Sequence, residues 1–171
     1  MRYIYKKMKS PLVKAIPLLF IISGCTITYD CEHLPQQNDG TPIEYSHQEC
    51  IGNNALKNKD YSSAITAYKK ALSIPLFESP NYELSYPLGV SLCKIGKYKQ
   101  GIKQLHHFEM MAKAELNEIP CPANYSDEKM EQFPEYIFYA CGGGASGLSE
   151  QGKIEMKQRL NTIPSLIQSC N

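Results

Sequence analysis

One pattern of small and aromatic residues occurs twice in this sequence, with a spacing of 37 residues (89 − 52). The matched positions are Gly52 and Gly89, Tyr61 and Tyr98, Ala64-Ile65 and Gly101-Ile102, Tyr68 and Leu105, and Ala71 and Phe108. A repeat of this length is typical of a small helical or mixed unit that buries its apolar face only by stacking on a neighbouring copy. The repeat therefore constrains the fold more than any other feature of the chain.

The first copy has the features of a helical hairpin. Its second half has one apolar face at helical spacing, made by Ala64, Ile65, Tyr68, Ala71 and Leu72. Either Asp60 or Ser62 can cap the free amides at the start of this helix, and Pro75 is expected to end it. Glycine and alanine would allow the two helices of the hairpin to approach closely, while the tyrosines fill the space between them.

These residues resemble the tetratricopeptide repeat (TPR), a unit of about 34 residues that folds as two antiparallel helices. The resemblance covers about residues 45–115, and its second copy departs from the family where Gly101 and Phe108 replace the usual alanines. It implies an all-α fold in which a short solenoid of helical hairpins occupies residues 45–171.

A third, degenerate copy is expected over residues 133–168. It is carried by Ala140, Gly147, Gly152, Met156, Leu160 and Pro164. We expect helices over about 134–142 and 149–163, separated by the glycine run 142–144, and a loop over about 116–132 that a disulfide holds. Fewer than about three repeats rarely bury a sufficient core, so this third copy is needed for stability.

The first 24 residues have the organisation of an export signal. A basic front contains Arg2, Lys6, Lys7, Lys9 and Lys14, and a short apolar run follows over residues 15–22. This run is too short to span a membrane as a helix, which takes about 20 apolar residues. The final residues, Ile22-Ser23-Gly24-Cys25, resemble the bacterial lipobox. The resemblance implies cleavage before Cys25 and acylation (diacylglycerol and palmitate) of that cysteine; the alternative is an ordinary signal peptide.

Acylated Cys25 would anchor the chain to a bilayer, with residues 25–44 as an N-terminal arm. The next residue is Thr26 and not the aspartate that retains many enterobacterial lipoproteins at the inner membrane. We therefore favour the periplasmic face of the outer membrane.

The net charge of the chain limits the classes of partner that it can bind. The signal contains five of the 18 basic residues and none of the 17 acidic ones, so the mature part has a net charge of 13 − 17 = −4. A mildly acidic protein of this kind is not expected to bind nucleic acid.

Six cysteines remain after Cys25, and an even number in an exported chain indicates disulfides. They are Cys31, Cys50, Cys93, Cys121, Cys141 and Cys170. Fifteen pairings are possible, and Cys31 with Cys50 is the one we favour. The Cys31-Glu32-His33 and His106-His107 groups lack the paired spacing of a zinc site, so we expect neither a metal nor a cofactor.

No enzyme motif is complete. Residues 147–153 imitate the start of a phosphate-binding loop, but Ile154 stands where serine or threonine would hold magnesium. Ser146 lacks the Gly-x-Ser-x-Gly context of a nucleophile. The carboxylates of Asp127, Glu128 and Glu131 are expected on a solvated surface. The sequence therefore does not predict an enzyme.

TPR proteins bind segments of other proteins in a groove lined by the first helix of each repeat. The resemblance places in this groove Glu49, Asn53, Leu56, Lys57, Tyr86, Val90 and Lys94. We expect a membrane-anchored adaptor that binds another envelope protein in secretion, pilus or outer-membrane assembly. Two alternatives stay open, namely an accessory lipoprotein of a peptidoglycan enzyme and a purely structural lipoprotein.

Overall fold

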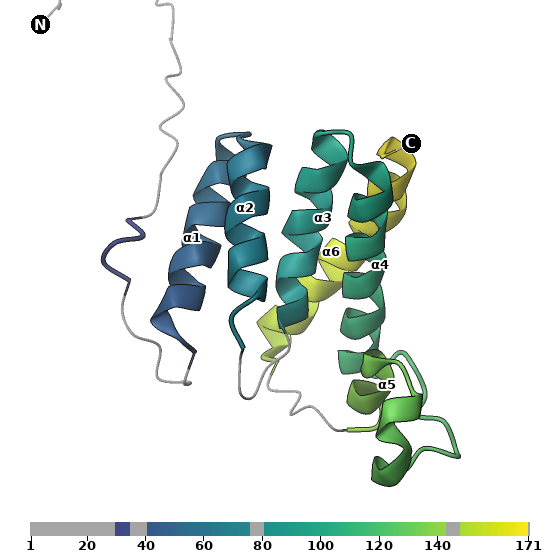
Figure 1. Cartoon of the computed structure of the whole chain (residues 1–171). Coiled ribbons are helices and arrows are strands. Elements are labelled where there is room, and N and C mark those ends of the chain that lie inside the picture. Colours follow the sequence, from purple (N-terminus) through teal and green to yellow (C-terminus); the bar gives the residue numbers. More distant parts are fainter. Residues whose placement is uncertain (1–29, 35–40, 76–80, 143–147, 171) are drawn as a thin grey trace, which may run out of the picture.

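In the computed structural model, the residues described are 30–34, 41–75, 81–142 and 148–170; the expected signal and Cys25 lie outside them. These residues form six α-helices and two short 3-10 helices, with no strand among them (Figure 1). The elements are α1 (Ile43–Lys57), α2 (Tyr61–Leu72), η1 (Asn81–Leu84), α3 (Ser85–Lys94), α4 (Tyr98–Glu115), η2 (Asp127–Gln132), α5 (Glu135–Ala140) and α6 (Glu150–Ser169). The expected all-α class is confirmed.

Helices α1 and α2 form the first hairpin. The turn between them contains Lys59 in a left-handed conformation (φ 60°), and the Asp60 carboxylate accepts a hydrogen bond from the Ser63 amide at 3.1 Å, which caps α2. Gly52 lies against Tyr68, because a Cβ at Gly52 would meet the tyrosine ring at 2.5 Å. The small residue is therefore required by the approach of the two helices.

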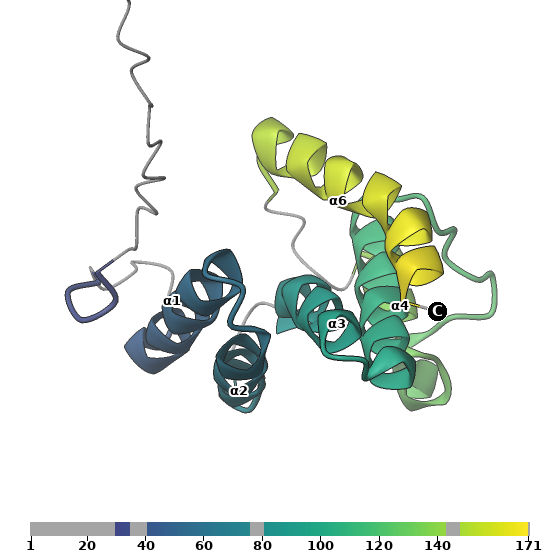
Figure 2. The ribbon, with the colours of Figure 1, turned by 90° about the horizontal axis from the view of Figure 1, so that it is seen from above.

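Helices α3 and α4 form a second hairpin of the same kind. Gly96 makes the turn with φ 80°, a conformation that favours glycine. Gly89 and Gly101 lie where the helices are closest: a Cβ on Gly101 would meet Cys93 Sγ at 2.5 Å, and one on Gly89 would meet Leu105 Cγ at 2.8 Å. The two hairpins stand side by side, with α2 packed against α3 (Figures 1 and 2).

The C-terminal region contains the two expected helices but does not form a third hairpin of this kind. Among the described residues, α5 packs on α4, whereas α6 lies across α4 and α3, as the view from above shows (Figure 2). The expectation that α6 ends before Pro164 is wrong, since the helix continues through this proline to Ser169. The cost of an interior proline is offset by the anchoring of the helix on both sides: Ile163 is buried, and the fully buried Cys170 forms a disulfide.

Three disulfides connect separate parts of the chain. Cys31 pairs with Cys50, which is the favoured pairing and attaches the N-terminal arm to the middle of α1. Cys93 pairs with Cys170 and joins the end of α3 to the end of α6. Cys121 pairs with Cys141 and holds the loop before η2 to the end of α5. The arm, α6 and the loop are thus each attached covalently to the hairpins.

Two apolar clusters form the interior. The first lies between α1, α2 and α3 and includes Tyr68, Leu88 and Leu92. The second lies between α3, α4 and α6 and includes Phe108, Met156 and Ile163. Because α6 supplies apolar residues to the second cluster, it substitutes for the missing third hairpin as the cover of α3 and α4.

Candidate functional site

A groove of about 230 Å³ lies where α1, the η1–α3 segment and α6 meet. Its lining residues are Glu49, Asn53, Glu83, Leu84, Tyr86, Pro87 and Arg159. The first helix of each hairpin forms two of its walls and α6 forms the third. We call this the α1–α3–α6 groove. It is the main candidate for a binding site.

The α1 wall of the groove is held in place from the core behind it. Glu49 and Asn53 are one helical turn apart and therefore lie on the same face of α1. The Tyr68 hydroxyl of α2 donates a hydrogen bond to Asn53 Oδ1 at 2.9 Å. Asn53 is itself exposed, whereas Tyr68 is fully buried. The buried tyrosine thus fixes the orientation of an exposed amide in the groove.

The groove is acidic. Burial raises the pKa of the Glu49 carboxyl above its usual value, and the nearby charge of Glu83 raises it further, while Arg159 lowers it. Arg159 Nη1 lies 3.6 Å from Glu83 Oε2. The groove therefore contains two carboxyl groups and one guanidinium, and a cationic ligand placed there would favour the charged form of Glu49.

On the α6 side the groove continues into a second hollow of about 270 Å³, lined by Tyr86, Glu155, Gln158, Arg159 and Thr162. The hydroxyls of Tyr86 and Thr162 are 2.8 Å apart and hydrogen-bonded, and the Tyr86 ring lies 5.3 Å from the Phe108 ring. Tyr86 thus lines both hollows, and its hydrogen bond links α3 to α6.

The structure brings together three of the seven predicted groove residues, Glu49, Asn53 and Tyr86. Leu56 and Val90 instead pack against the first and second apolar clusters. Lys57 and Lys94 are exposed and lie at the C-terminal ends of α1 and α3.

The other four lining residues were not predicted from the sequence; they are Glu83, Leu84, Pro87 and Arg159. The first three lie in or beside η1, a segment with no repeat signal. Arg159 enters the groove because α6 crosses α3, and no periodicity in the chain predicts that crossing.

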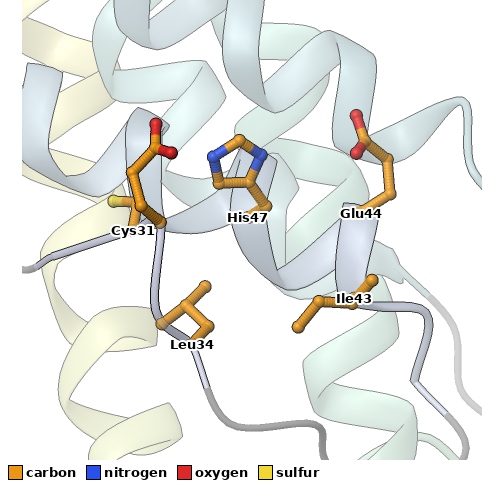
Figure 3. A pocket seen from close by; sticks show the side chains of 6 residues that line it. Cys31, Leu34, Ile43, Glu44 and His47 are labelled. Carbon is orange, nitrogen blue, oxygen red and sulfur yellow. The ribbon is translucent and has the colours of Figure 1, made fainter.

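A smaller pocket of about 200 Å³ lies between the N-terminal arm and α1 (Figure 3). Its lining residues are Cys31, Glu32, Leu34, Ile43, Glu44 and His47. Glu44 pairs with Lys70 at 2.8 Å and accepts a hydrogen bond from Gln48, and the Lys70 ammonium lowers the pKa of this carboxyl. Its carboxylate is therefore already paired within the protein.

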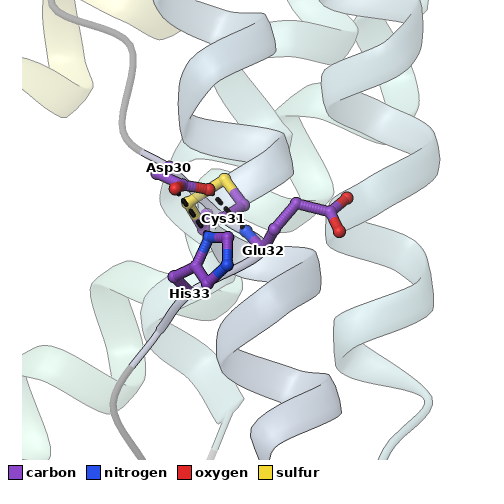
Figure 4. A network of polar contacts seen from close by, with 5 residues as sticks. Asp30, Cys31, Glu32 and His33 are labelled. Atoms are coloured by element: carbon purple, nitrogen blue, oxygen red, sulfur yellow. Dashed lines mark hydrogen bonds and ion pairs between the residues drawn. A yellow bond between two sulfur atoms is a disulfide. The ribbon is translucent and has the colours of Figure 1, made fainter.

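The arm also contains the Cys31-Glu32-His33 group (Figure 4). Cys31 is in a disulfide, and His33 Nδ1 lies 2.8 Å from the Asp30 carboxylate, whose pKa this hydrogen bond lowers. Asp30 also accepts a hydrogen bond from the Glu32 amide at 3.0 Å. No group of three His, Cys, Asp or Glu residues within the described ranges is placed to hold a metal ion.

One arrangement resembles the order of groups in a serine hydrolase. Ser85 Oγ lies 3.0 Å from His107 Nδ1, and His107 Nε2 lies 3.8 Å from Glu135 Oε2. Ser85 is only 1% exposed, however, so its hydroxyl cannot meet a substrate. These contacts instead connect the starts of α3 and α5 to the middle of α4.

In the described part of the chain, every helix is too short or too polar to cross a bilayer. The chain matches no protein-family model, no curated protein and no solved structure.

Proposed function

We propose that the α1–α2 and α3–α4 hairpins are two TPR-like units of a lipid-anchored adaptor, which binds a segment of another envelope protein in the α1–α3–α6 groove. The observation that carries this proposal is the concave site at the first helices of both hairpins, where Glu49, Asn53 and Tyr86 meet. A hollow of this kind gives a peptide both a shape to fill and polar groups to bind.

The charge of the groove defines the ligand further. Glu49 and Glu83 outnumber Arg159, and the half-buried side chains of Tyr86 and Pro87 supply apolar surface beside them. A lysine or arginine side chain fits this combination, because its aliphatic part packs on apolar groups while its charged end meets a carboxylate. The proposed partner therefore presents a basic residue in an accessible segment.

Membrane attachment through acylated Cys25 is the second part of the proposal. Its support is the basic front, the apolar run and the Ile22-Ser23-Gly24-Cys25 sequence. Incorporation of a labelled fatty acid by the native chain and its loss in Cys25→Ala is the expected result. Equal labelling of both chains would contradict lipidation at Cys25.

The groove is tested by capturing partners from detergent-solubilised envelopes with three forms of the full chain. Glu49→Lys reverses a charge in the groove, and Glu128→Lys makes the same change at an exposed position in η2. We expect a partner that native protein and Glu128→Lys retain and that Glu49→Lys loses by more than tenfold, since a like charge in the groove opposes a basic ligand.

Thermal unfolding of each form tests whether the fold is kept. Recovery of the same proteins by all three forms would remove the groove from the proposal, whether or not Cys25 is acylated.

A further inference from the structure

The end of the molecule formed by the α1–α2 and α3–α4 turns is rich in lysine. Both turns lie at the top in Figure 1, because α1 and α3 run towards this end and α2 and α4 run away from it. We call it the lysine end and define it by Lys59, Lys94, Lys97, Lys99 and Lys103 with Ile95 and Tyr98, all of which are exposed.

The positive charge of this end is not neutralised by nearby acidic residues. Between Glu83 and Glu109 the sequence contains no aspartate or glutamate. Asp60 lies at the same end, but its carboxylate caps α2 through Ser63. Among the described residues, none of the ion pairs involves a lysine of the lysine end.

The α3 dipole favours Lys94, which is in the last turn of that helix, but helix stability does not explain Lys97 or Lys99. Lys97 is the N-cap of α4 and its side chain makes no capping hydrogen bond, while the equivalent position in the first hairpin is the capping residue Asp60. The positive end of the α4 dipole also lies here, and it disfavours Lys97 and Lys99. Lysine is therefore present in spite of its local effect on the helix.

Two large side chains stand among these charges. Ile95 is 37% exposed and Tyr98 is 47% exposed. A tyrosine with an apolar ring and a polar hydroxyl, surrounded by lysines, is the combination that favours the headgroup region of a bilayer.

We propose that the lysine end contacts the surface of an anionic phospholipid membrane. Phosphate groups of the headgroups meet the lysines, and the side chains of Ile95 and Tyr98 enter the interface between headgroups and acyl chains.

The position of the proposed anchor permits this orientation but does not select it, because Cys50 lies midway between the two ends of α1; this point rests on acylation of Cys25. Cys31 is fixed to Cys50, seven residues before the end of α1 at Lys57, which is about 10 Å along the helix axis. The six residues from Cys25 to Cys31 span at most about 22 Å. An acylated Cys25 can therefore reach the plane of the lysine end.

One part of the opposite end of the molecule is acidic, although Lys69 and Lys70 in the last turn of α2 also lie at that end. The segment η2 and the start of α5 contain Glu128, Glu131 and Glu135, with Lys129 as the single basic residue among them. An anionic surface repels this acidic segment and attracts the lysine end, so we expect the hairpins to stand upright on the membrane. In this orientation the α1–α3–α6 groove opens sideways and stays accessible to a partner.

The test is a lysine footprint of the full chain. The protein is mixed with phosphatidylcholine vesicles that either contain or lack phosphatidylglycerol, and exposed lysines are acylated briefly and located by mass spectrometry. We expect labelling of Lys94, Lys97 and Lys99 to fall several-fold with the anionic vesicles alone, and to recover in high salt. Lys69, Lys129 and Lys157 serve as internal controls, because they are exposed elsewhere.

A triple variant makes the result specific. In Lys94→Gln/Lys97→Gln/Lys99→Gln, the remaining reporters Lys59 and Lys103 should lose their protection. In Lys69→Gln/Lys129→Gln/Lys157→Gln, which has the same net charge, they should keep it. The readout is local to each lysine, so it does not depend on what else attaches the chain to the vesicle.

Unchanged labelling of the lysine end on anionic vesicles would overturn the proposal. Protection by a soluble acidic polypeptide but not by vesicles would also overturn it, in favour of an acidic protein partner. Neither result bears on the groove, which the capture experiment tests separately.

Discussion

The two hairpins share one plan, and three of the matched positions at which they differ bear on contacts of the second hairpin. Ala64 of the first hairpin corresponds to Gly101 of the second, Ala71 to Phe108, and Asp60 to Lys97. Each of these three differences coincides with a feature that only the second hairpin has. The comparison shows how a repeat keeps its geometry while it acquires new contacts.

The glycine and the phenylalanine both accommodate α6. Gly101 leaves room for Cys93, whose sulfur joins α6 through Cys170. Phe108 is fully buried in the cluster that α6 completes, and it contacts Tyr82 and Tyr86. In the first hairpin Ala71 is equally buried, but it faces no such helix. The departures from the repeat pattern therefore mark the docking site of α6.

The largest expected effect comes from removing the bond that holds α6. Cys93→Ala/Cys170→Ala opens a loop with a sequence separation of 77 residues, against 19 for Cys31→Ala/Cys50→Ala. Loop-closure entropy predicts losses of about 4.5 kcal/mol and about 3 kcal/mol in the free energy of unfolding. Urea unfolding of the two double variants measures both losses. Equal losses, or a larger loss in Cys31→Ala/Cys50→Ala, would show that the disulfide of α6 constrains the chain no more than the disulfide of the N-terminal arm.

The next effect comes from the packing of α6 on the second hairpin. Phe108→Ala leaves a cavity between α4 and α6, and truncation of a buried phenylalanine costs about 3–5 kcal/mol. Ala71→Gly is the matched change in the first hairpin and should cost about 1 kcal/mol. Chemical denaturation compares them. Similar losses of stability would contradict the inference that Phe108 contributes packing against α6 that Ala71 does not.

Exchanging the N-cap residues should give α4 a side-chain cap and remove the one that α2 has. Lys97→Asp gives α4 the cap that Asp60 gives α2, and we expect a gain of about 1 kcal/mol in stability. Asp60→Lys should lose a similar amount. Thermal unfolding measures both changes. If Lys97→Asp brings no gain, lysine at this position is compensated within the hairpin and the argument for an external anionic partner is weaker.

The smallest effect concerns the groove that both hairpins line. Burial raises the pKa of Glu49 above its ordinary 4.5, so the folded state binds the proton more tightly than the unfolded state. Stability then falls as pH rises from about 4.5 through the raised pKa, because the unfolded state releases its proton first.

Glu49→Gln removes this penalty and should be more stable at neutral pH by less than about 1 kcal/mol, since the carboxylate is partly exposed. The difference should vanish below the ordinary pKa. Stability measured across pH for both proteins tests this expectation, and a constant difference would exclude Glu49 ionisation as its source.

The local pattern of the sequence was a good guide to the hairpins and a poor one to the C-terminal region. Spacing placed Gly52 and Gly89 at helix contacts, and the contact distances bear this out. The pairing of Cys31 with Cys50, favoured as a link between the N-terminal arm and the first helix, is also present. It missed Arg159 and η1 in the groove, since neither belongs to a repeated pattern.

By itself, the sequence determined the elements that depend on neighbouring residues: the helices, the turn at Gly96, the cap at Asp60 and the apolar faces. The tertiary structure alone decided where α6 lies. The residues of α6 are compatible with a third hairpin, but α5 has only six residues and offers too little surface to pair with a helix of twenty. Helix α6 instead packs on the larger apolar surface of α3 and α4, and the disulfide from Cys93 to Cys170 holds it there.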